Sequence, residues 1–560
     1  MSETDLLNQE KQFSGELPML GLMMSRELMI SDLIEHAATV HTKREIMSVN
    51  SDMSQHRYGW GDCAVRVRKL ANALIAAGVK TGDRVATIAW NNYRHIEIYY
   101  AVSSIGAVVH TINPRLKPEQ IAWMVNHAED KFVMFDTTFG PIIDGVHSVC
   151  PTVERWICLT DKAGMPDYKA PVEDYESFIA DASETIDWPR FDENTACTLC
   201  YTSGTTGDPK GVLYSHRSTI LHAMAGCATD VIGGGGGDTI LGVVPMFHVS
   251  AWGLVYSAAM VGAKLVMPGP GLDGPSLTEL ILQEGVTLMA GVPTVWLGIY
   301  NHCKAEGIKL PKVKKALVGG SALPESLLRA YEQDLGIPMQ QGWGMTETSP
   351  LGSTYAPHPD TDLDDYESTV PHKLLAGRRI YGVEMRIVDD EGNELPADGQ
   401  ASGHLHVRGP WVASGYFKGA GTDAFTDDGW FATGDVSALH PEGYMEITDR
   451  SKDVIKSGGE WVSSIEIENA ACDHPDVSMA ACIGVRHEKW QERPMLIVQP
   501  VPGKTPNKDE IKACIANKCA KWWMPDAIVF QDELPLGATG KILKRELKIT
   551  YKDFDLEGGA

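Results

Sequence analysis

The sequence predicts an α/β protein in which helices cover parallel sheets, followed by a β-rich part and a small α+β unit. Three observations support this prediction. Helical and strand patterns alternate from residue 60 to 136 and again from 239 to 291, short alternating strands follow residue 378, and a compact mixture of helices and strands follows residue 453. Strands that alternate with helices at this spacing are typical of βαβ units, and 560 residues are enough for about two to four domains.

The alternating region supplies the parallel sheets. In some of its segments apolar residues recur with the period of a helix, and in others they form short runs that suit buried strands. The expected helices are 65–77, 96–105, 118–127, 252–260 and 277–284. The expected strands are 84–90, 107–112, 131–135, 239–244, 263–267 and 287–291.

The later part of the chain has a different character. Strands are expected at 384–388 and 404–408 with Gly and Asp turns between them, which indicates a β-rich subdomain. Beyond residue 453 we expect helices at 464–471 and 508–518 and strands at 479–485 and 495–500. This mixture predicts a separate, compact α+β unit.

Composition argues against several partners. The chain carries 49 basic and 74 acidic residues, a formal net charge of −25, and such a surface repels nucleic acid and anionic membranes. Residues 1–17 lack the pattern of a signal peptide, and no apolar run approaches the roughly 18 residues of a membrane span. The 11 cysteines are scattered, which favours reduced thiols. We therefore expect a cytoplasmic protein with no nucleic-acid partner and no membrane insertion.

Three local features allow two interpretations each. Cys197 and Cys200 have the spacing of a redox or zinc half-site, but no second pair completes a zinc site and a buried strand is favoured. The five glycines at 233–237 favour a surface loop over a phosphate cradle, because no cation follows them. The acidic stretch 360–367 favours a solvated loop over a metal site.

The most specific motif is the segment 201–211, YTSGTTGDPKG, which follows a predicted buried strand and precedes a predicted helix at 219–225. Its glycines turn the backbone and expose N–H groups, its hydroxyls add donors, and Lys210 adds a cation, which suits a polyphosphate. A Walker A loop has Gly, Lys and Ser or Thr in succession, whereas Asp208 and Pro209 separate Gly207 from Lys210 here. We expect a phosphate loop of another kind, with a structural Gly/Ser loop as the alternative.

This loop resembles the signature of the adenylate-forming superfamily, which includes acyl- and aryl-CoA synthetases, the adenylation domains of peptide synthetases, and firefly luciferase. Further motifs that resemble those of the superfamily follow in its order. They are the adenine turn at 319–323, the acyl and nucleotide segment at 342–347, the ribose acid at 433–435, the hinge at 449–453, the thioester segment at 457–460 and the lysine loop at 535–541.

The resemblance implies a domain organisation. The N-terminal adenylation domain would span 1–451, with the β-rich subdomain at about 378–449, and a mobile C-terminal domain would span 452–560 with its hinge at Lys452. Such a domain presents two faces to one site in turn. Exchanging the faces separates adenylate formation from thioester formation and keeps water out.

The resemblance also implies the roles of individual residues. Attack of a carboxylate on the α-phosphate spreads negative charge over phosphoryl oxygens, so catalysis rests on positioning and electrostatic stabilisation. The implied catalytic residues are Lys541, Glu347 and Thr346, and the implied Mg²⁺ ligands are Glu347 and Thr205. Without the resemblance, Lys541 would be one lysine of a basic tail and Glu347 a helix cap.

Nucleotide binding and thioester formation involve larger sets. ATP or AMP contacts are implied for Thr202, Ser203, Gly204, Thr205, Thr206, Gly207, Lys210, Gly320, Ser321, Ala322, Gly342, Trp343, Gly344, Met345, Thr346, Asp435, Ile447 and Arg450. The face that meets CoA is implied for Gly458, Gly459, Glu460 and Trp461.

The acyl pocket is expected at His248, Val249, Trp252, Gly320 and Gly344. Peptide-synthetase domains usually place an Asp near the position of His248 to pair with an α-ammonium, and without an acid here an amino acid would bury that charge unpaired. His248 gates the site or is simply packed; both readings stay open. Acetate-specific relatives carry a Trp at the position of Gly344, so the pocket is not closed to two carbons by that device.

Together these resemblances predict an AMP-forming acid–CoA ligase with ATP and CoA as co-substrates and Mg²⁺ as cofactor. Several segments are similar to medium- and long-chain fatty acid–CoA ligases and to 3-methylmercaptopropionate–CoA ligases, which predicts a short-to-medium-chain fatty acid or 3-methylmercaptopropionate as the acid. The alternatives are a longer-chain ligase, an acyl-AMP ligase, a luciferase-like oxidase and a non-catalytic binding protein. A homodimer is expected from the habit of the family alone.

Overall fold

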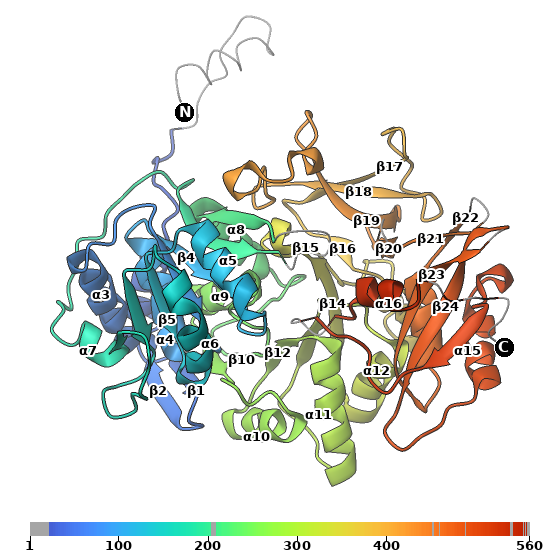
Figure 1. Cartoon of the computed structure of the whole chain (residues 1–560), viewed down its shortest axis with the longest axis horizontal. Helices are drawn as coiled ribbons and strands as arrows, with labels where there is room; N and C mark the ends of the chain where they lie inside the picture. The colour runs from blue at the N-terminus through green and yellow to red at the C-terminus, as the bar shows by residue number, and fades with distance from the viewer. Residues whose placement is uncertain are drawn as a thin grey trace, which may run out of the picture.

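A computed structural model of the chain describes residues 22–202, 209–450, 453–457, 460–487, 489–537 and 541–552, with Phe554 and Leu556. Within these residues the strands form sheets of nine, seven, five and four strands. The two larger sheets lie side by side in the first part of the chain, and the smaller two follow in the later part (Figure 1).

The seven-stranded sheet has the order β7-β6-β5-β3-β4-β8-β9 and is parallel except for the β8–β9 pair. Its strands are short and mostly buried, as expected of a parallel sheet covered on both faces. They are β3 (Arg84–Ile88), β4 (Val108–Thr111), β5 (Phe132–Phe135), β6 (Arg155–Cys158), β7 (Val172–Asp174), β8 (Ala196–Tyr201) and β9 (Gly211–Ser215).

The nine-stranded sheet has the order β16-β15-β14-β13-β12-β10-β11-β1-β2 and has a parallel centre with antiparallel edges. Its strands are β1 (Glu45–Val49), β2 (Gln55–Gly59), β10 (Thr239–Gly242), β11 (Lys264–Met267), β12 (Leu288–Gly291), β13 (Lys315–Val318), β14 (Met339–Gly344), β15 (Leu351–Thr354) and β16 (Arg378–Arg379).

Helices fill three layers around these sheets. Between the sheets, in one shared core, lie α2 (Ile30–Val40), α3 (Trp60–Ala76), α4 (Tyr93–Ser104), α8 (His216–Gly226) and α9 (Leu254–Val261). The outer face of the seven-stranded sheet is covered by α5 (Pro118–Ala128) and α6 (Gly140–Val146). The outer face of the nine-stranded sheet is covered by α10 (Gly274–Glu284), α11 (Pro293–Glu306) and α12 (Glu325–Arg329). These layers follow the order αβαβα and confirm the prediction of parallel sheets covered by helices.

The β-rich part is an antiparallel sheet of four strands. They are β17 (Glu384–Val388), β18 (Ser402–Arg408), β19 (Phe431–Leu439) and β20 (Met445–Arg450). Two of these strands were expected from the sequence. The sheet leads into the C-terminal unit, because β20 ends just before residues 451 and 452.

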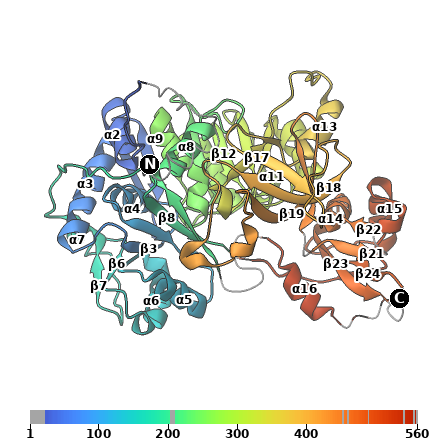
Figure 2. The ribbon, with the colours of Figure 1, turned by 90° about the horizontal axis from the view of Figure 1, so that it is seen from above.

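The C-terminal unit lies at one end of the molecule and has buried cores of its own (Figure 2). It is the α+β unit that the sequence predicted. Its strands are β21 (Ile455–Ser457), β22 (Glu460–Val462), β23 (Val477–His487), β24 (Gln491–Pro500) and β25 (Ala527–Phe530). Its helices are α14 (Ser464–Cys472), α15 (Lys508–Lys518) and α16 (Lys544–Thr550). The predicted boundary at 451/452 and the hinge at Lys452 lie outside the described residues and stay predictions.

One expected helix begins later than predicted. The pattern indicated a helix from residue 252, but α9 begins at Leu254. Before it, residues 249 to 252 have φ between 43° and 57°, and Gly253 has φ of 73°. Such angles are uncommon for residues with side chains, so the segment 249–253 forms a left-handed turn that ordinary helix periodicity does not anticipate.

The three ambiguous sequence features are ordinary structure. Cys197 and Cys200 are buried in β8 and carry free thiols. The glycine run 233–237 is a loop that leads into β10, and the acidic stretch 360–367 is a loop up to the start of α13 (Tyr366–Leu374). None of the helices in the described ranges is long and apolar enough to cross a membrane.

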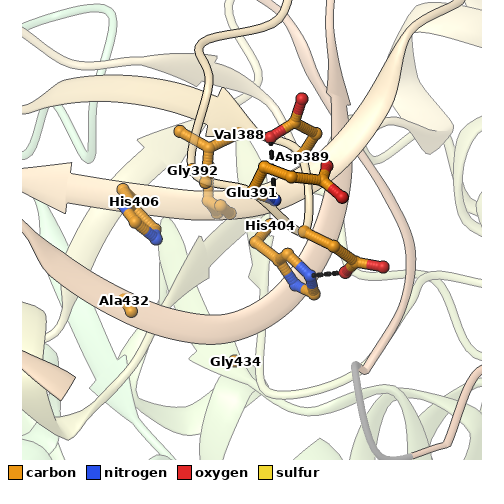
Figure 3. A pocket seen from close by; sticks show the side chains of 10 residues that line it. Val388, Asp389, Glu391, Gly392, His404, His406, Ala432 and Gly434 are labelled. Carbon is orange, nitrogen blue, oxygen red and sulfur yellow. Dashed lines mark hydrogen bonds and ion pairs between the residues drawn. The ribbon is translucent and has the colours of Figure 1, made fainter. Parts of the chain in front are cut away.

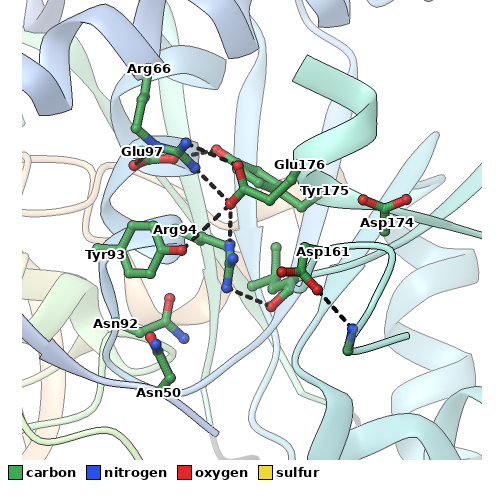
Figure 4. A network of polar contacts seen from close by, with 12 residues as sticks. Asn50, Arg66, Asn92, Tyr93, Arg94, Glu97, Asp161, Asp174, Tyr175 and Glu176 are labelled. Atoms are coloured by element: carbon green, nitrogen blue, oxygen red, sulfur yellow. Dashed lines mark hydrogen bonds and ion pairs between the residues drawn. The ribbon is translucent and has the colours of Figure 1, made fainter. Parts of the chain in front are cut away.

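A polar network ties three helices beside the seven-stranded sheet (Figure 4). Arg66 of α3 bonds to Glu97 of α4 at 2.7 Å and to Glu176 at 2.9 Å, where Glu176 belongs to α7 (Tyr175–Ile179). Arg94 of α4 also bonds to Glu176, at 2.8 Å. The Tyr175 hydroxyl donates to Glu97 at 2.6 Å. This network is a structural brace, remote from the cleft described next.

Candidate active site

A cleft of about 2220 Å³ lies where the C-terminal unit faces the large sheets. Both parts of the chain supply its walls. The predicted site residues that line it are Thr202, His248, Gly320, Ser321, Ala322, Gly342, Trp343, Gly344, Asp435, Ile447, Arg450 and Lys541. Residues from six of the predicted motifs therefore lie around one cleft.

The two ends of the phosphate loop are hydrogen-bonded to each other where β8 ends and β9 begins. The Thr202 N–H donates to the Lys210 carbonyl at 2.9 Å, and the Lys210 N–H donates to the Thr202 hydroxyl oxygen at 3.2 Å. The predicted contacts Ser203, Gly204, Thr205, Thr206 and Gly207 lie between these ends and outside the described residues. Two adjacent strands thus present the loop from a fixed base.

Asp435 is held by two donors that come from different sheets. The register of β19 and β20 sets Asp435 opposite Arg450, whose Nε lies 2.9 Å from Asp435 Oδ1. The Trp343 indole N–H, at the end of β14, donates to Asp435 Oδ2 at 3.0 Å. The carboxylate is only 2% exposed, and each of its oxygens keeps a second lone pair for further donors such as a ribose diol.

Glu347 and Thr346 lie in a short turn after β14. The Thr346 carbonyl accepts a hydrogen bond from the Tyr214 hydroxyl at 2.7 Å, and Glu347 Oε1 accepts one from the Tyr416 hydroxyl at 2.6 Å. Burial raises the pKa of Glu347, against the opposing effect of the Tyr416 hydrogen bond.

The donor set fits a Mg²⁺ ion that arrives with a nucleotide. Glu347 offers a buried carboxylate, a hard oxygen ligand. In the described parts of the chain, Glu347 included, no group of three or more His, Cys, Asp or Glu side chains could hold a metal. A single carboxylate with phosphate oxygens and waters is a usual environment of Mg²⁺ in nucleotide enzymes, whereas a dedicated protein cage would need more ligands.

Lys541 reaches the cleft from the C-terminal unit. The segments before residue 538 and after residue 540 pair with each other, because the Gly537 N–H donates to the Lys541 carbonyl at 2.6 Å and the Leu543 N–H to the Pro535 carbonyl at 2.8 Å. On the opposite wall stands His248. Burial, together with the nearby Lys541 ammonium, lowers the pKa of His248 to about 4, so its imidazole is neutral at neutral pH.

Two residues expected in the acyl pocket lie behind its wall. Val249 is 2% exposed and Trp252 is half-buried, and neither lines the cleft. A Cβ on Gly319 would stand 2.8 Å from the Trp252 ring, so the ring packs closely against that backbone. A Cβ on Gly344 would collide with the Pro350 carbonyl oxygen, which explains glycine there.

Other predicted residues lie near the cleft without lining it. The residues concerned are Lys210, Met345, Thr346 and Glu347, each of which is close in sequence to a residue that lines the cleft. Gly458 and Gly459 are outside the described residues, and for Glu460 and Trp461 only the backbone strand β22 is described. The face implied for CoA therefore stays a prediction.

The sequence did not point to three residues that support the site. Tyr416 and Tyr214 hold the Glu347 segment, and the Gln341 side chain accepts a hydrogen bond from the Leu323 N–H at 2.9 Å, which fixes the predicted adenine turn. Tyr214 and Gln341 are next to recognisable motifs, whereas Tyr416 is 69 residues from its partner.

A smaller pocket of about 340 Å³ lies on the β-rich sheet (Figure 3). Asp390 pairs there with His404 at 2.8 Å. The Asp389 carboxylate accepts from the N–H groups of Glu391 and Asn393. Asp389 and Asp390 thus already have partners within the protein, and the pocket is not the candidate site.

Comparisons with known proteins agree with this geometry. Residues 34–417 match the model of the AMP-binding enzyme family, and residues 466–541 match that of the AMP-binding enzyme C-terminal domain. The chain is 48% identical to the 3-methylmercaptopropionyl-CoA ligase of Ruegeria lacuscaerulensis, over 96% of this chain and 99% of the relative. It is also 48% identical to the medium-chain-fatty-acid–CoA ligase of Ectopseudomonas oleovorans, over 97% and 99%.

A solved structure shares the fold. The anthranilate CoA ligase AuaEII, in complex with anthranoyl-AMP, superposes with a TM-score of 0.83 at 24% identity, over 95% of this chain and 98% of that one. With both family models matched in order and relatives covered almost end to end, the chain belongs to the AMP-binding enzyme family, within its AMP-forming acid–CoA ligases.

Proposed function

We propose that this ligase activates a short-to-medium-chain fatty acid or 3-methylmercaptopropionate. The supporting observation is the wall opposite Lys541, where His248 is neutral and follows the buried, apolar Phe247. An uncharged wall suits an acid whose tail carries no ammonium. The two relatives at 48% identity act, by name, on acids of these two kinds. A thioether acid and a short fatty acid are similar in shape, and an apolar pocket separates neighbours by only about 1–3 kcal/mol per methylene.

In the first half-reaction the chain's own residues bind and orient two anions. The phosphate loop and Lys210 hold the triphosphate, Asp435 and Arg450 hold the ribose, and Lys541 lies between the carboxylate and the α-phosphate. A Mg²⁺ ion held by Glu347 and Thr205 would neutralise charge on the triphosphate. Positive groups around the reacting oxygens stabilise the negative charge that develops as the carboxylate attacks the α-phosphate. The step therefore depends on positioning and charge stabilisation, without a covalent enzyme intermediate.

In the second half-reaction the C-terminal domain turns about Lys452 and brings Gly458, Gly459 and β22 to the site. The glycines allow the backbone to approach the pantetheine arm closely. The thiol of CoA then attacks the acyl-adenylate and AMP leaves. The exchange of faces moves Lys541 out of the site once the adenylate has formed. It also keeps water away from the mixed anhydride.

A panel of acids tests the substrate. Straight-chain acids of increasing length, 3-methylmercaptopropionate, aryl acids and an amino acid are incubated with ATP, Mg²⁺ and CoA, and AMP and acyl-CoA are quantified. We expect the largest kcat/KM for the short and medium acids and the thioether acid, and none for the amino acid. A clear preference for acids beyond medium length would replace this assignment by the second candidate, a longer-chain ligase.

The same assay separates the other outcomes. AMP release that does not require CoA, or acyl transfer to a carrier protein, would indicate an acyl-AMP ligase, and oxygen-dependent light emission a luciferase-like oxidase. We further propose a cytoplasmic homodimer. Light scattering of the purified protein at micromolar concentration measures the dimer directly, and a mass near that of one chain would exclude it.

A further inference from the structure

Tyr416 joins two parts of the nucleotide site that are distant in sequence. It lies in the loop between β18 and β19, and its hydroxyl donates to Glu347 Oε1 at 2.6 Å. That length is typical of a hydrogen bond to an ionised carboxylate. Glu347 is 6% exposed, so few water molecules compete for this oxygen. The hydroxyl therefore fixes the direction in which the carboxylate presents its other lone pairs.

The aromatic ring of Tyr416 contacts Lys210, the lysine at the end of the phosphate loop. Lys210 Nζ lies 4.9 Å from the centre of the Tyr416 ring, within the range of a cation–π interaction. On its other side the lysine is packed against Gly421, where φ is +59° and any Cβ would collide with Lys210 Nζ. The Lys210 ammonium is thus confined between an aromatic face and a glycine.

The tyrosine itself is held firmly. Its ring packs against Phe425 at 5.3 Å and Phe431 at 6.4 Å between ring centres. The loop that carries it is tied to the Glu347 turn, because the Ala413 N–H donates to the Glu347 carbonyl at 2.7 Å and the Ser349 hydroxyl to the Trp411 carbonyl at 2.7 Å. Because the Tyr416 side chain is rigid and contacts both Glu347 and Lys210, it can fix the position of each relative to the other.

We propose that Tyr416 is a positioning residue that sets the Glu347 carboxylate and the Lys210 ammonium in one geometry for a metal–nucleotide complex. The proposal rests on the proposed metal role of Glu347. The hydroxyl orients the carboxylate toward the metal, and the ring keeps the lysine directed at the phosphates. The two functions reside in different atoms of one side chain, so two substitutions separate them.

The first substitution, Tyr416→Phe, removes the hydroxyl and keeps the ring. Affinity for Mn²⁺, used as a paramagnetic substitute for Mg²⁺, is measured by EPR in the presence of a non-hydrolysable ATP analogue and without turnover. We expect the affinity to fall roughly 10- to 100-fold, as for the loss of a hydrogen bond to a charged group. The Mg²⁺ concentration for half-maximal pyrophosphate release should rise in parallel, and excess Mg²⁺ should restore kcat.

The second substitution, Tyr416→Leu, removes the ring as well. Lys210 then loses its aromatic face, so KM for ATP should rise beyond that of Tyr416→Phe, by about another two- to fivefold, and excess Mg²⁺ should not correct it. Tyr444→Phe is the matched control, because the Tyr444 hydroxyl donates to the Ala356 carbonyl at 2.8 Å and not to Glu347. Its metal affinity and KM should equal those of the unaltered protein.

A double-mutant cycle protects the test against a general loss of structure. If the hydroxyl acts through the carboxylate, Tyr416→Phe should weaken Mn²⁺ binding little in a Glu347→Gln background. Additive losses, or unchanged metal affinity in Tyr416→Phe, would overturn the proposal. Metal affinity that Glu347→Gln alone leaves unchanged would instead remove the metal role of Glu347 and leave the ligase assignment intact.

Discussion

Lys541 illustrates what a single side chain is expected to do in this protein. It lies on the C-terminal unit, lines the cleft and faces His248. Lys541→Ala removes the cation nearest the proposed site of attack while leaving the ribose and phosphate-loop contacts in place. We expect adenylate formation, measured as pyrophosphate release, to fall by at least about 10²-fold, as for other single stabilising groups.

Two comparisons make the Lys541 prediction specific. ATP affinity of Lys541→Ala, followed by tryptophan fluorescence, should stay within a few-fold of the unaltered protein. Lys552→Ala removes an exposed lysine of the same basic tail and should leave pyrophosphate release unchanged. Equal turnover of Lys541→Ala and Lys552→Ala would contradict the assignment.

His248 yields a prediction about pH. Its pKa lies near 4, below the ordinary value of 6.5, because burial and the Lys541 ammonium disfavour the protonated ring. The imidazole therefore gains its proton only below about pH 5 and carries no charge change near neutrality. We expect His248→Asn to alter KM for the acid while its pH–rate profile above about pH 6 keeps the shape of the unaltered protein. A limb near pH 6.5 that disappears in His248→Asn would contradict this.

At the scale of residues, the sequence predicted a site residue only where that residue belongs to a recognisable motif. Asp435, Trp343 and Arg450 were all expected at the nucleotide site, and the structure adds that Trp343 and Arg450 each bond to the Asp435 carboxylate. Tyr416 was not expected. Its role depends on two loops that meet only in the folded chain, and an isolated Tyr has no periodicity or spacing that would predict such a contact.

At the scale of elements, the brace between α3, α4 and α7 is expected to contribute much stability. Glu97 is fully buried and accepts hydrogen bonds from Arg66 and Tyr175. Glu97→Ala leaves the Arg66 charge with one carboxylate instead of two and opens a polar cavity. We expect it to lower the free energy of unfolding by about 3–5 kcal/mol, measured by urea denaturation.

A surface pair provides the contrast. Glu154 bonds to Lys131 at 3.0 Å with both side chains well exposed, at 58% and 38%. Glu154→Ala should change the free energy of unfolding by about 1 kcal/mol or less. If the two Glu→Ala variants were equally stable, the buried network would not be the brace described above.

The elements themselves were largely predictable because most follow strict hydrophobic periods. The helix 508–518 and the strand 384–388 have the predicted bounds, and most others differ by a few residues at their ends. The exception beside the cleft is the left-handed turn at 249–253, where tertiary packing overrides the local preference. Hydrophobic patterns in one sequence indicate which face of an element is buried. They do not indicate where the backbone adopts positive φ.

At the scale of the whole molecule, an ion pair links the C-terminal unit to the large domain, and we expect it to favour the orientation described here. Lys518 of α15 reaches across to Glu325 of α12, with 2.6 Å between Nζ and Oε2. This is the orientation in which Lys541 lines the cleft. Lys518→Gln should slow adenylate formation roughly two- to fivefold, as expected of a partly exposed pair, and leave thioester formation from preformed adenylate equal or faster.

Single-turnover kinetics of each half-reaction measure this effect. Lys314→Gln removes a comparable pair, with Asp238 at 2.8 Å, that lies within the large domain, and it should change neither step. A uniform slowing of both half-reactions in Lys518→Gln would show that the ion pair supports structure and not the choice of orientation.

Buried histidines predict how the whole fold responds to acid. His95, His216 and His222 are at most 2% exposed, and burial lowers the pKa of each to about 4 from 6.5. Between pH 6.5 and 4 these histidines bind protons in the unfolded chain but not in the folded chain. Their contribution to the free energy of unfolding is therefore complete above about pH 6.5 and decreases as the pH falls toward 4. Each histidine contributes a slope of about 1.4 kcal/mol per pH unit.

Buried acids such as Asp136 and Glu466 oppose this trend. Burial raises the pKa of Asp136 to about 6 and, with Glu446 nearby, that of Glu466 to about 7, so these groups favour the folded state as the pH falls. His216→Gln removes one group that binds a proton near pH 6.5 only in the unfolded chain. Its melting temperature should therefore fall less steeply than that of the unaltered protein between about pH 6.5 and 4.5. Equal slopes in the two proteins would contradict the prediction.

The reversed hand of the backbone at 249–253 also constrains anyone who wishes to redesign acid selectivity. A saturation library at Ser250, Ala251 and Trp252 would not sample twenty equivalent choices, since bulky β-branched replacements suffer most at positive φ while Gly, Asn and Asp tolerate it. Many losses of activity in such a library would reflect misfolded chains and not poor substrate fit. Mutational tolerance there is thus set first by chain geometry, and directed evolution should enter through His248 or through the layer of side chains that supports Trp252.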